Sequence, residues 1–423
     1  MSTFAIVRLI DKIVFVYEKM RAMQTTIART PRIILLAVYV LASMAMFIAA
    51  ILSPQFANIA KAPLRDFVMP EPEPVVLSLL YSTEKAAWLD EIITEFETTQ
   101  KTANGRPIRI ELSKAGSRDI YLDVLNGAQP DMISPASSLQ ISLLKDLSEA
   151  KFGSAIVDSA GTQDCRPVLK TPLVLVAWSE RADVLWGDEI NGDLWRELHA
   201  AVTDPEGWAS YGQAEWGYVK FGQTDPLKSN SGFMTIVLMT ADYFGQSNLN
   251  AADILSDQAY QEWFLDFQNT ISEFGDSTGT YMREIVAYGP SKYDIVAVYE
   301  ATAIEQAENA EGRYGELRVY YPPATVMSDH PFCILNGDWV TPEKQEAARL
   351  FVEYLSSTPA QELALMDYGF RPVDTSIPLD QSASPFQTYR NHGIRIDIPD
   401  EITIPDGNTL NTLLDFWNRN VGQ

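Results

Sequence analysis

Four short segments of the sequence are rich in small hydroxyl side chains, and each directly precedes a predicted helix. They cover residues 81–85, 116–118, 134–138 and 224–232. A serine or threonine at such a position can cap the helix, and the free backbone N–H groups and helix dipole there favour an anion. One such turn is fully explained as an ordinary N-cap. Four of them at the carboxyl ends of strands are typical of an α/β protein that binds a ligand in a cleft.

The segments around these turns alternate between strand-like and helix-like patterns. Apolar or alternating runs predict strands at 75–80, at 108–112 and from Leu169 to Trp178. Helical spacing and terminal signals predict helices after residue 88, at 263–274, at about 342–355 and from 358 to Gly369. This alternation favours α/β architecture with largely parallel sheets. The 371 residues from 53 onward exceed the usual size of one core, so two lobes are expected.

The charge is unevenly distributed along the chain. Lys and Arg total 32 against 56 Asp and Glu, a net charge of −24, yet residues 1–32 carry six basic and two acidic side chains. The acidic remainder argues against nucleic-acid binding, which needs clustered positive charge. Two cysteines and three histidines argue against Cys/His metal clusters, and no hydrolase, zinc-protease or phosphate-loop motif is present. We therefore predict no catalytic residue, no metal and no cofactor.

An uncharged, proline-free run of 20 residues extends from Ile33 to Leu52. About 20 residues span a hydrocarbon core roughly 30 Å thick, so this run predicts a single transmembrane segment. The basic residues before it predict that residues 1–32 are cytoplasmic and that the main body is extracytoplasmic. A retained signal anchor is favoured over a signal peptide cleaved after Ala62, because the apolar run exceeds the usual 7–15 residues.

The segments on either side of this run have their own patterns. Residues 1–32 are partly amphipathic, so they either lie on the inner membrane surface, dock a partner helix or are merely solvated. Residues 53–74 contain five prolines and predict a semi-rigid tether.

The order of several motifs along the chain resembles a known family. The residues that carry the likeness are Tyr81 to Lys85, Pro130-Asp131, Ser134 to Ser138, Gly222 to Pro226, Ser229 to Gly232, Asp329-His330-Pro331 and Gly369 to Pro372. Over roughly residues 74 to 375 the chain resembles bacterial extracellular solute-binding proteins of the molybdate-binding-like type. It is most similar to the substrate-binding half of proteins that also carry a von Willebrand factor A domain, here without that domain.

The resemblance implies a type II periplasmic-binding-protein fold, with two α/β lobes, two crossover strands, a ligand between the lobes and closure by a hinge motion. On this basis residues 75–170 and 328–423 are expected to form the first lobe, and residues 171–327 the second. The strand from Leu169 to Trp178 would run toward the first crossover, and the segment from Val319 to Leu335 would contain the return.

The resemblance also implies a set of ligand-binding residues. Ser82 and Ser117 match the two turns that contact an oxyanion in molybdate binders, although residues 114–118 lack the second glycine of the usual Gly-Ser-Gly turn. The full set of candidates is Ser82, Thr83, Ser117, Ser137, Thr224, Ser229, Asn230, Ser231 and Tyr293.

Cys165 and Cys333 flank the predicted crossover strands, in a part of the chain expected to lie outside the cytoplasm, where disulfides persist. A disulfide between them is favoured over two buried free thiols.

These observations favour a membrane-anchored receptor that captures a small ligand, with an anion as one option, for a transporter or sensor. The alternative is a structural or regulatory subunit that reuses the same fold to bind protein partners, such as a von Willebrand factor A-type protein. An enzyme is the least favoured function, because the catalytic motifs are missing.

Overall fold

The computed structural model describes most of the chain, as two compact units. The described residues are 29–52, 72–99, 102, 104–187, 193–245 and 249–422. One unit is Met1–Pro72 and the other is Glu73–Gln423. Most of the amphipathic segment 1–32 and nearly all of the predicted tether 53–74 lie outside the described residues.

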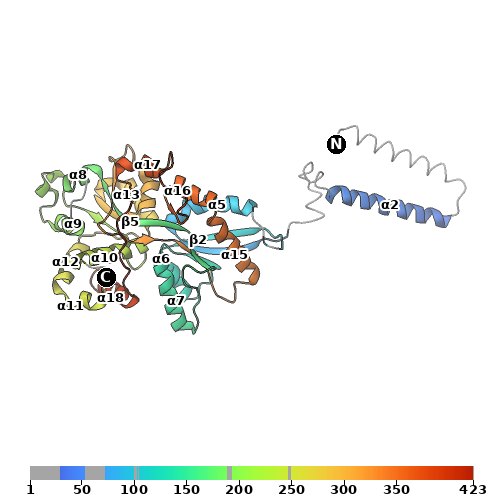
Figure 1. Cartoon of the computed structure of the whole chain (residues 1–423), viewed down its shortest axis with the longest axis horizontal. Coiled ribbons are helices and arrows are strands. Elements are labelled where there is room, and N and C mark those ends of the chain that lie inside the picture. The colour runs from blue at the N-terminus through green and yellow to red at the C-terminus, as the bar shows by residue number, and fades with distance from the viewer. Residues whose placement is uncertain are drawn as a thin grey trace. The chain divides into compact units, whose positions relative to one another are not determined.

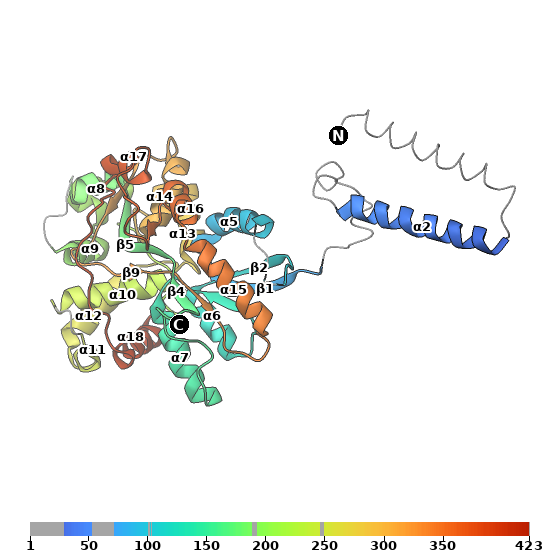
Figure 2. The same ribbon diagram turned by 45° about the vertical axis from the view of Figure 1, so that its right-hand side comes forward.

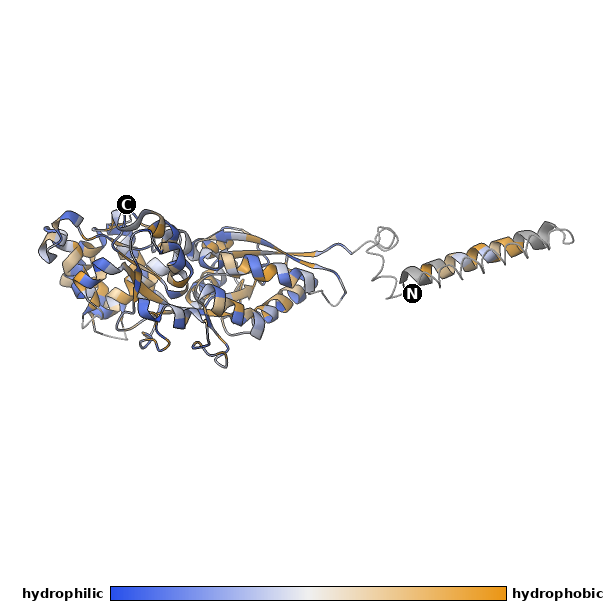
Figure 3. Cartoon of the chain, turned by 90° about the horizontal axis from the view of Figure 1, so that it is seen from above, coloured by the Kyte–Doolittle hydropathy of each residue, from blue (hydrophilic) through white to orange (hydrophobic). Residues whose placement is uncertain are grey.

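The described part of the first unit is helix α2 (Arg29–Leu52), which has 24 residues. Ile34, Leu36 and Leu41 on this helix are 62%, 59% and 63% exposed. Figure 3 draws the helix mainly in orange and pale tones. When only the described residues are counted, no helix is long and apolar enough to cross a membrane. The membrane anchor therefore stays a prediction from the sequence.

The second unit begins with a five-stranded sheet in the order β2-β1-β3-β10-β4. Its strands are β1 (Val75–Ser82), β2 (Ile108–Ala115), β3 (Met132–Ser134), β4 (Cys165–Pro167) and β10 (Pro331–Ile334). β1 is parallel to β2 and to β3, whereas β10 is antiparallel to both of its neighbours. The strands predicted at 75–80 and 108–112 are confirmed as parts of β1 and β2.

Helices pack on this sheet to complete lobe one (Figure 1). They are α5 (Ala86–Thr99), α6 (Ser117–Leu125), α7 (Ser138–Phe152), α15 (Pro342–Leu355) and α16 (Thr358–Tyr368), with the short 3₁₀ turn η2 (Thr83–Lys85) before α5. The apolar face of α5 packs against α15, where the rings of Phe96 and Phe351 lie 4.9 Å apart between centroids. Gly369 ends α16 in the left-handed conformation, as its position in the sequence predicts.

Lobe two is built around the long strand β5 (Leu169–Trp178). Its sheet follows the order β11-β5-β7-β6, and β8 and β9 also pair with β5. The other strands are β6 (Phe221–Gly222), β7 (Ile295–Tyr299), β8 (Leu317–Tyr320), β9 (Met327–Ser328) and β11 (Arg371–Pro372). The expectation of largely parallel sheets is wrong for this lobe, because every pairing of β5 is antiparallel and only β6–β7 is parallel in the described residues.

Helices surround the second sheet on both faces (Figures 1 and 2). They are α8 (Ser179–Leu185), α9 (Leu194–Thr203), α10 (Asn230–Tyr243), α11 (Ala251–Ser256), α12 (Gln258–Gln268), α13 (Thr278–Tyr288) and α14 (Glu300–Ala310). Short 3₁₀ turns are η3 (Gly207–Tyr211), η4 (Ala214–Trp216) and η5 (Gly289–Ser291). The helix α10 is buried along nearly its whole length, which explains its apolar sequence after the opening polar turn.

The chain crosses between the lobes at three places. Val168 joins β4 of lobe one to β5 of lobe two, and Asp329 and His330 join β9 back to β10. After α16 the chain enters lobe two again, because β11 pairs with the start of β5. The first crossing precedes the strand from Leu169 to Trp178 rather than following it, and the second lies within the segment from Val319 to Leu335.

The C-terminal segment 371–423 packs on lobe two, so its assignment to lobe one is wrong. It contains α17 (Pro385–Thr388), η6 (Arg390–His392) and α18 (Gly407–Asn420). The apolar face of α18 joins the lobe-two core, and Trp417 donates from Nε1 to Gln268 Oε1 at 2.9 Å. Figures 1 and 2 both show α18 beside α11. An amphipathic helix requires an apolar partner surface, but its own sequence does not say which lobe supplies it.

A buried ion pair fixes the start of this segment. Arg371 donates to both carboxylate oxygens of Glu300, from Nε at 2.7 Å and from Nη2 at 2.8 Å. The same guanidinium donates to the backbone carbonyls of Arg395 and Ile396, and Tyr321 donates its hydroxyl to Glu300. Glu300 is thus engaged in structural pairing, and no cluster that could hold a metal ion occurs in the described residues.

The two cysteines lie opposite each other on the crossover strands. Cys165 of β4 and Cys333 of β10 are paired residues in the antiparallel ladder, both are fully buried, and the structure joins them by a disulfide. The bond links positions 168 residues apart in the sequence. It therefore ties the outgoing and returning crossings together within lobe one.

We expect the double variant Cys165→Ser/Cys333→Ser to be less stable than the native protein by about 2–5 kcal/mol, because it loses the loop-closure constraint on the unfolded chain. Urea unfolding with and without reductant measures this. Reductant should lower the midpoint of the native protein and leave that of the double variant unchanged. Two free thiols in the exported native protein, detected by mass spectrometry without reductant, would contradict the assignment.

Candidate functional site between the two lobes

Three turns of lobe one lie side by side, because they follow the carboxyl ends of the neighbouring strands β2, β1 and β3. Ser82 ends β1, and its Oγ lies 3.3 Å from the carbonyl oxygen of Ser134 at the end of β3. Ser117, at the start of α6, accepts a hydrogen bond from Ala136 N at 3.0 Å. Ser137 caps α7 by accepting from Leu139 N at 3.2 Å. The hydroxyls of Ser117 and Ser137 thus hold the turns in shape.

Lobe two contributes a cluster of hydroxyls at the starts of α10 and α13. Ser231 Oγ lies 2.7 Å from Thr224 Oγ1 and 2.7 Å from Thr278 Oγ1. Ser229 Oγ lies 3.3 Å from Thr278 Oγ1. Gly232 donates its N–H to Thr224 Oγ1 at 2.7 Å, and a Cβ on Gly232 would lie 2.0 Å from the Thr224 carbonyl oxygen. The glycine is therefore required for this close packing.

Asn230 links this cluster to lobe one. Its Nδ2 donates to Tyr299 OH at 3.0 Å and to Ser328 Oγ at 3.3 Å, both in lobe two. Its Oδ1 accepts from Gln140 Nε2 of α7 at 2.9 Å. The side chains of Asn230 and of its three partners are all buried. The amide of Asn230 thus forms a direct hydrogen bond across the lobe boundary.

The lobes are in direct contact at two further points. Arg118 N donates to the carbonyl of Lys228 at 3.1 Å. A Cβ on Gly116 would lie 2.4 Å from that same carbonyl oxygen, and a Cβ on Gly279 would lie 3.2 Å from Thr83 O and Glu84 Cα. The structure is therefore a closed arrangement of the two lobes, in which glycines allow the turns to approach.

A charged cluster is buried in the lobe-one turn that faces this contact. The side chain of Lys85 is 0% exposed and that of Glu84 is 3% exposed. Lys85 Nζ lies 3.3 Å from Glu84 Oε1 and donates to Ser82 Oγ at 2.5 Å. Nδ1 of His330, which is fully buried, lies 3.3 Å from both Lys85 Nζ and Glu84 Oε1.

The protonation states of this cluster follow from burial and mutual contact. Burial alone would raise the pKa of Glu84, but the Lys85 ammonium and the hydrogen bond with His330 hold that pKa well below its usual range. Burial lowers the pKa of Lys85, and Glu84 opposes that effect. Burial and the neighbouring Lys85 lower the pKa of His330. These directions favour an ionised Glu84 beside a neutral imidazole, and Glu84 in turn favours the charged form of Lys85 against the effect of burial.

His330 also has an unusual backbone, because its φ of 40° lies in the left-handed region although it is not a glycine. Its N–H donates to Ala136 O at 3.0 Å, and it lies at the crossing between β9 and β10. Such a conformation costs of order 1–3 kcal/mol and persists only when the surroundings impose it. The backbone at this crossing thus places the imidazole against Glu84 and Lys85 at an energetic cost.

Several polar atoms at this boundary are buried and have no hydrogen-bond partner among the described residues. They are Thr83 Oγ1, Ser134 Oγ, Gln140 Oε1 and His330 Nε2. Each such group costs about 1–3 kcal/mol when unpaired. Buried polar atoms are nearly always paired with protein, water or ligand, so the boundary has hydrogen-bonding capacity for a bound molecule.

Comparison with known proteins places these features in a family. Residues 77–371 match the family described as "Bacterial extracellular solute-binding protein". The chain belongs to this family. Its function is therefore to bind a solute rather than to catalyse a reaction, and the family description places the domain outside the cytoplasm. No curated protein matches the chain.

Solved structures of low sequence identity share the fold of this solute-binding protein. The sulfate-binding protein SubI from Mycobacterium tuberculosis matches with TM-score 0.52 and 17% identity, over 79% of this chain and 96% of that one. Iron-bound HitA from Pseudomonas aeruginosa matches with TM-score 0.52 and 15% identity, over 83% of this chain and 100% of that one. A maltose-bound protein from T. maritima matches with TM-score 0.54 and 13% identity, over 80% of this chain and 90% of that one. These matches show the two-lobed fold alone.

Eight of the nine predicted ligand residues of the solute-binding protein lie on the turns at the lobe boundary, and Tyr293 does not. Tyr293 packs in the core of lobe two against Tyr281, with ring centroids 5.1 Å apart, and donates its hydroxyl to Glu273 O at 3.1 Å. It precedes β7, so it lies at the opposite end of that strand from Tyr299, the residue that reaches Asn230. The prediction for Tyr293 is therefore wrong.

Glu84, Lys85 and His330 belong to the boundary but are absent from the predicted set. The sequence places Glu84 and Lys85 in the first turn and His330 in the Asp-His-Pro motif, and both motifs carry the family resemblance. What the sequence does not give is their burial, since charged residues at a helix start are usually solvated.

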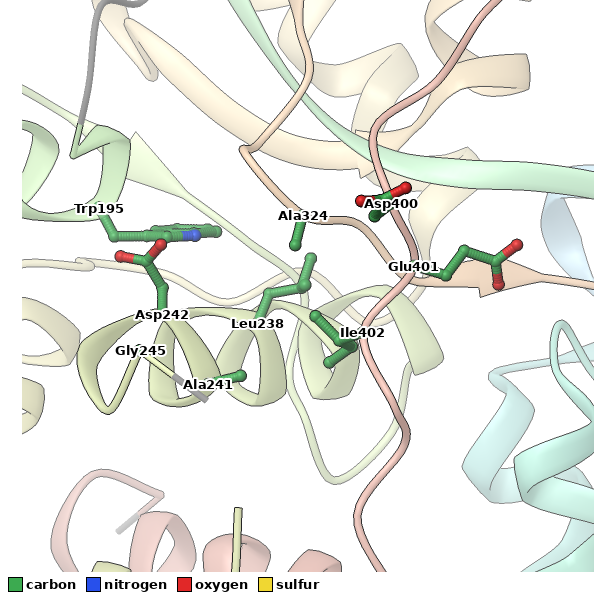
Figure 4. A pocket seen from close by; sticks show the side chains of 9 residues that line it. All are labelled: Trp195, Leu238, Ala241, Asp242, Gly245, Ala324, Asp400, Glu401 and Ile402. Atoms are coloured by element: carbon green, nitrogen blue, oxygen red, sulfur yellow. The ribbon is translucent and has the colours of Figure 1, made fainter. Parts of the chain in front are cut away.

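A separate cavity of about 290 Å³ lies within lobe two of the solute-binding protein (Figure 4). It is lined by Trp195, Leu238, Ala241, Asp242, Gly245, Ala324, Asp400, Glu401 and Ile402. Figure 4 shows Asp242 beside the ring of Trp195, with Ile402 above α10 from the C-terminal segment. No residue of the lobe-one turns lines it, so this cavity is distinct from the boundary site.

We expect Gly116→Ala to hold the lobes apart. The backbone of Gly116 has φ −66° and ψ 151°, which alanine adopts without strain, so the effect comes from the new contacts of the Cβ, chiefly the clash with the Lys228 carbonyl oxygen. Small-angle X-ray scattering should show a larger radius of gyration, and ligand affinity should fall about tenfold or more, since each 1.4 kcal/mol against closure costs a factor of ten. Gly407→Ala is the control, because a Cβ there meets nothing. A Gly116→Ala variant with unchanged scattering would contradict the closed contact.

Proposed function

We propose that this protein is a membrane-anchored extracytoplasmic receptor that holds a small solute between its two lobes and presents it to a transporter or sensor. The observation that carries the proposal is the set of buried, unpartnered polar atoms on turns of lobe one, facing the hydroxyl cluster of lobe two. A site divided between two lobes makes closure depend on the ligand, because only the closed state completes its contacts.

The ligand contacts proposed here come from both lobes. Thr83 and Ser134 have unpartnered hydroxyls on the lobe-one turns. Ser229 and Ser231 supply hydroxyls from the start of α10, where the helix N-terminus adds partial positive charge. Five predicted residues at the boundary remain. Ser82, Ser117, Ser137 and Thr224 already support the turns, and Asn230 bridges the lobes.

The membrane anchor in this proposal rests on the sequence from Ile33 to Leu52, with residues 1–32 in the cytoplasm. The tether 53–74 would hold the second unit, Glu73–Gln423, clear of the membrane. A receptor held in this way delivers its ligand at a high effective concentration to a membrane partner, which does not need to capture it from dilute solution. Family membership favours this role over that of a purely structural subunit.

The binding proposal is tested by thermal unfolding against a panel of solutes that includes sulfate, ferric ion, maltose, other sugars and amino acids. A ligand that binds only the folded state at 100 times its Kd adds about 2.7 kcal/mol of stability, which raises Tm by several degrees. At least one member should shift Tm in a saturable way. A panel that shifts nothing would count against solute capture.

For that panel member, we expect Thr83→Val with Ser229→Ala to weaken binding about tenfold or more. The substitution removes one hydroxyl from each lobe, and a lost hydrogen bond at a buried site costs about 1–3 kcal/mol. Isothermal titration calorimetry measures the affinity. Ser154→Ala, at an exposed serine, is the control that should leave it unchanged. Equal affinities for the double variant and the native protein would remove these residues from the site.

We expect the full-length protein to stay in the membrane pellet after high-salt washing and to be released by detergent. The same body exported from residue 73 behind an unrelated cleavable signal should be soluble. The mass of the mature full-length protein separates the two sequence-based alternatives, because cleavage after Ala62 would remove the apolar run. A full-length protein released by salt alone would contradict the anchor.

A further inference from the structure

The carboxylate of Glu84 takes up the hydrogen-bond donors that the lobe-one turn would offer to an anion. Ser82 Oγ lies 2.5 Å from Glu84 Oε1, in a contact assigned with the serine as donor. Lys85 Nζ lies 3.3 Å and His330 Nδ1 also 3.3 Å from the same oxygen. A hydroxyl, an ammonium and an imidazole around one carboxylate oxygen are a typical set of anion ligands. Here the anion they surround belongs to the chain itself.

The position of this carboxylate is at the lobe boundary rather than on the outer surface. The turn that carries it follows β1, and Gly279 of α13 approaches so closely that its Cβ would lie 3.2 Å from Glu84 Cα. The ring of His330 lies 6.0 Å from that of Tyr299, measured between centroids, and Tyr299 is bonded to Asn230. The carboxylate is thus within the group of residues from both lobes that forms the proposed site.

The charges at this position are already balanced without a ligand. Lys85 is the fully buried cation of the cluster, and Glu84 pairs with it. Asp329 adds a second carboxylate nearby, which accepts hydrogen bonds from Ser138 N at 2.7 Å and from Ser138 Oγ. A free oxyanion would therefore bring further negative charge next to two carboxylates in a place shielded from water, where like charges repel strongly.

We propose that Glu84 is a built-in anion that determines specificity: its carboxylate occupies the anion position of the interlobe site, so the site rejects free oxyanions and takes a polar solute without net negative charge. This inference rests on the proposed solute-capture function and deepens it. The unpartnered atoms around the cluster include hydroxyls and an amide oxygen, which together can both donate to and accept from an uncharged polar ligand.

The test is chemical rescue of Glu84→Ala by small anions. The substitution removes the carboxylate and leaves Ser82, Lys85 and His330 facing a space of its size. Sodium sulfate, sodium molybdate and sodium acetate are titrated at constant ionic strength set with chloride, and Tm is recorded. We expect a saturable rise in Tm for Glu84→Ala with at least one of these anions, and none for the native protein.

Two matched variants identify the cause of the rise. Glu84→Gln keeps the volume of the side chain, so it should leave no space for an anion and show no saturable response. Glu84→Ala with Lys85→Met removes the ammonium as well, so it should lose the response of Glu84→Ala. A response that survives in both variants would come from elsewhere on the protein and would overturn the proposal.

Direct calorimetry on the native protein supplies a readout that does not depend on how well the variants fold. Saturable binding of sulfate, molybdate or phosphate to the native protein would overturn the proposal while supporting solute capture. If Glu84→Ala is folded and no anion stabilises it, the proposal also fails. Rescue of Glu84→Ala, with no response of the native protein to any sugar or amino acid, would instead support the built-in anion and count against the broader receptor function.

Discussion

The lobe-one turn that faces lobe two is built around a buried ion pair between Glu84 and Lys85. Neither charge could be buried alone, because an unpaired charge in the interior costs several kcal/mol. Their pairing therefore requires that the turn after β1 stay in one conformation, and Ser82 and His330 complete the contacts around it. His330 lies at the crossing between the lobes, in a strained left-handed conformation. The ion pair thus links the turn at residues 82–85 to the crossing at His330, and lobe two packs against both.

Two glycines and the disulfide shape the region where the lobes meet. Gly116 lets backbones of opposite lobes approach within a distance that a Cβ would prevent, and Gly279 allows a second approach that a Cβ would make tight. The disulfide between Cys165 and Cys333 holds the two crossing strands together on the lobe-one side. The strands that lead to and from the first two crossings are therefore joined covalently within lobe one, whereas the lobes meet by packing and hydrogen bonds.

The sequence predicts the elements and the turns of this protein better than it predicts its contacts. The strands β1 and β2 and the helices α15 and α16 lie where local patterns place them, since periodicity and capping are local properties. The candidate ligand residues come from the family resemblance, and eight of the nine lie at the lobe boundary. The prediction for Tyr293 differs from the structure because the local sequence after a 3₁₀ turn does not show which way a tyrosine side chain points. In the folded protein this side chain is buried in the core of lobe two. The segment 371–423 fails for a related reason, because the apolar face of α18 is compatible with either lobe.

The sequence alone determines the family, the alternation of strands and helices, and the hydroxyl-rich turns, because each of these is set by residues close together in the chain. Only the tertiary structure decides that Ser82 faces Glu84 rather than open solvent, and that the cluster is buried and balanced in charge. Lys85 and His330 are 245 positions apart in the chain, so no local pattern joins them. Burial, pairing and the resulting pKa shifts depend on which distant groups fold against one another, and in the folded protein the turn predicted to favour an anion holds the carboxylate of Glu84 against Ser82 and Lys85.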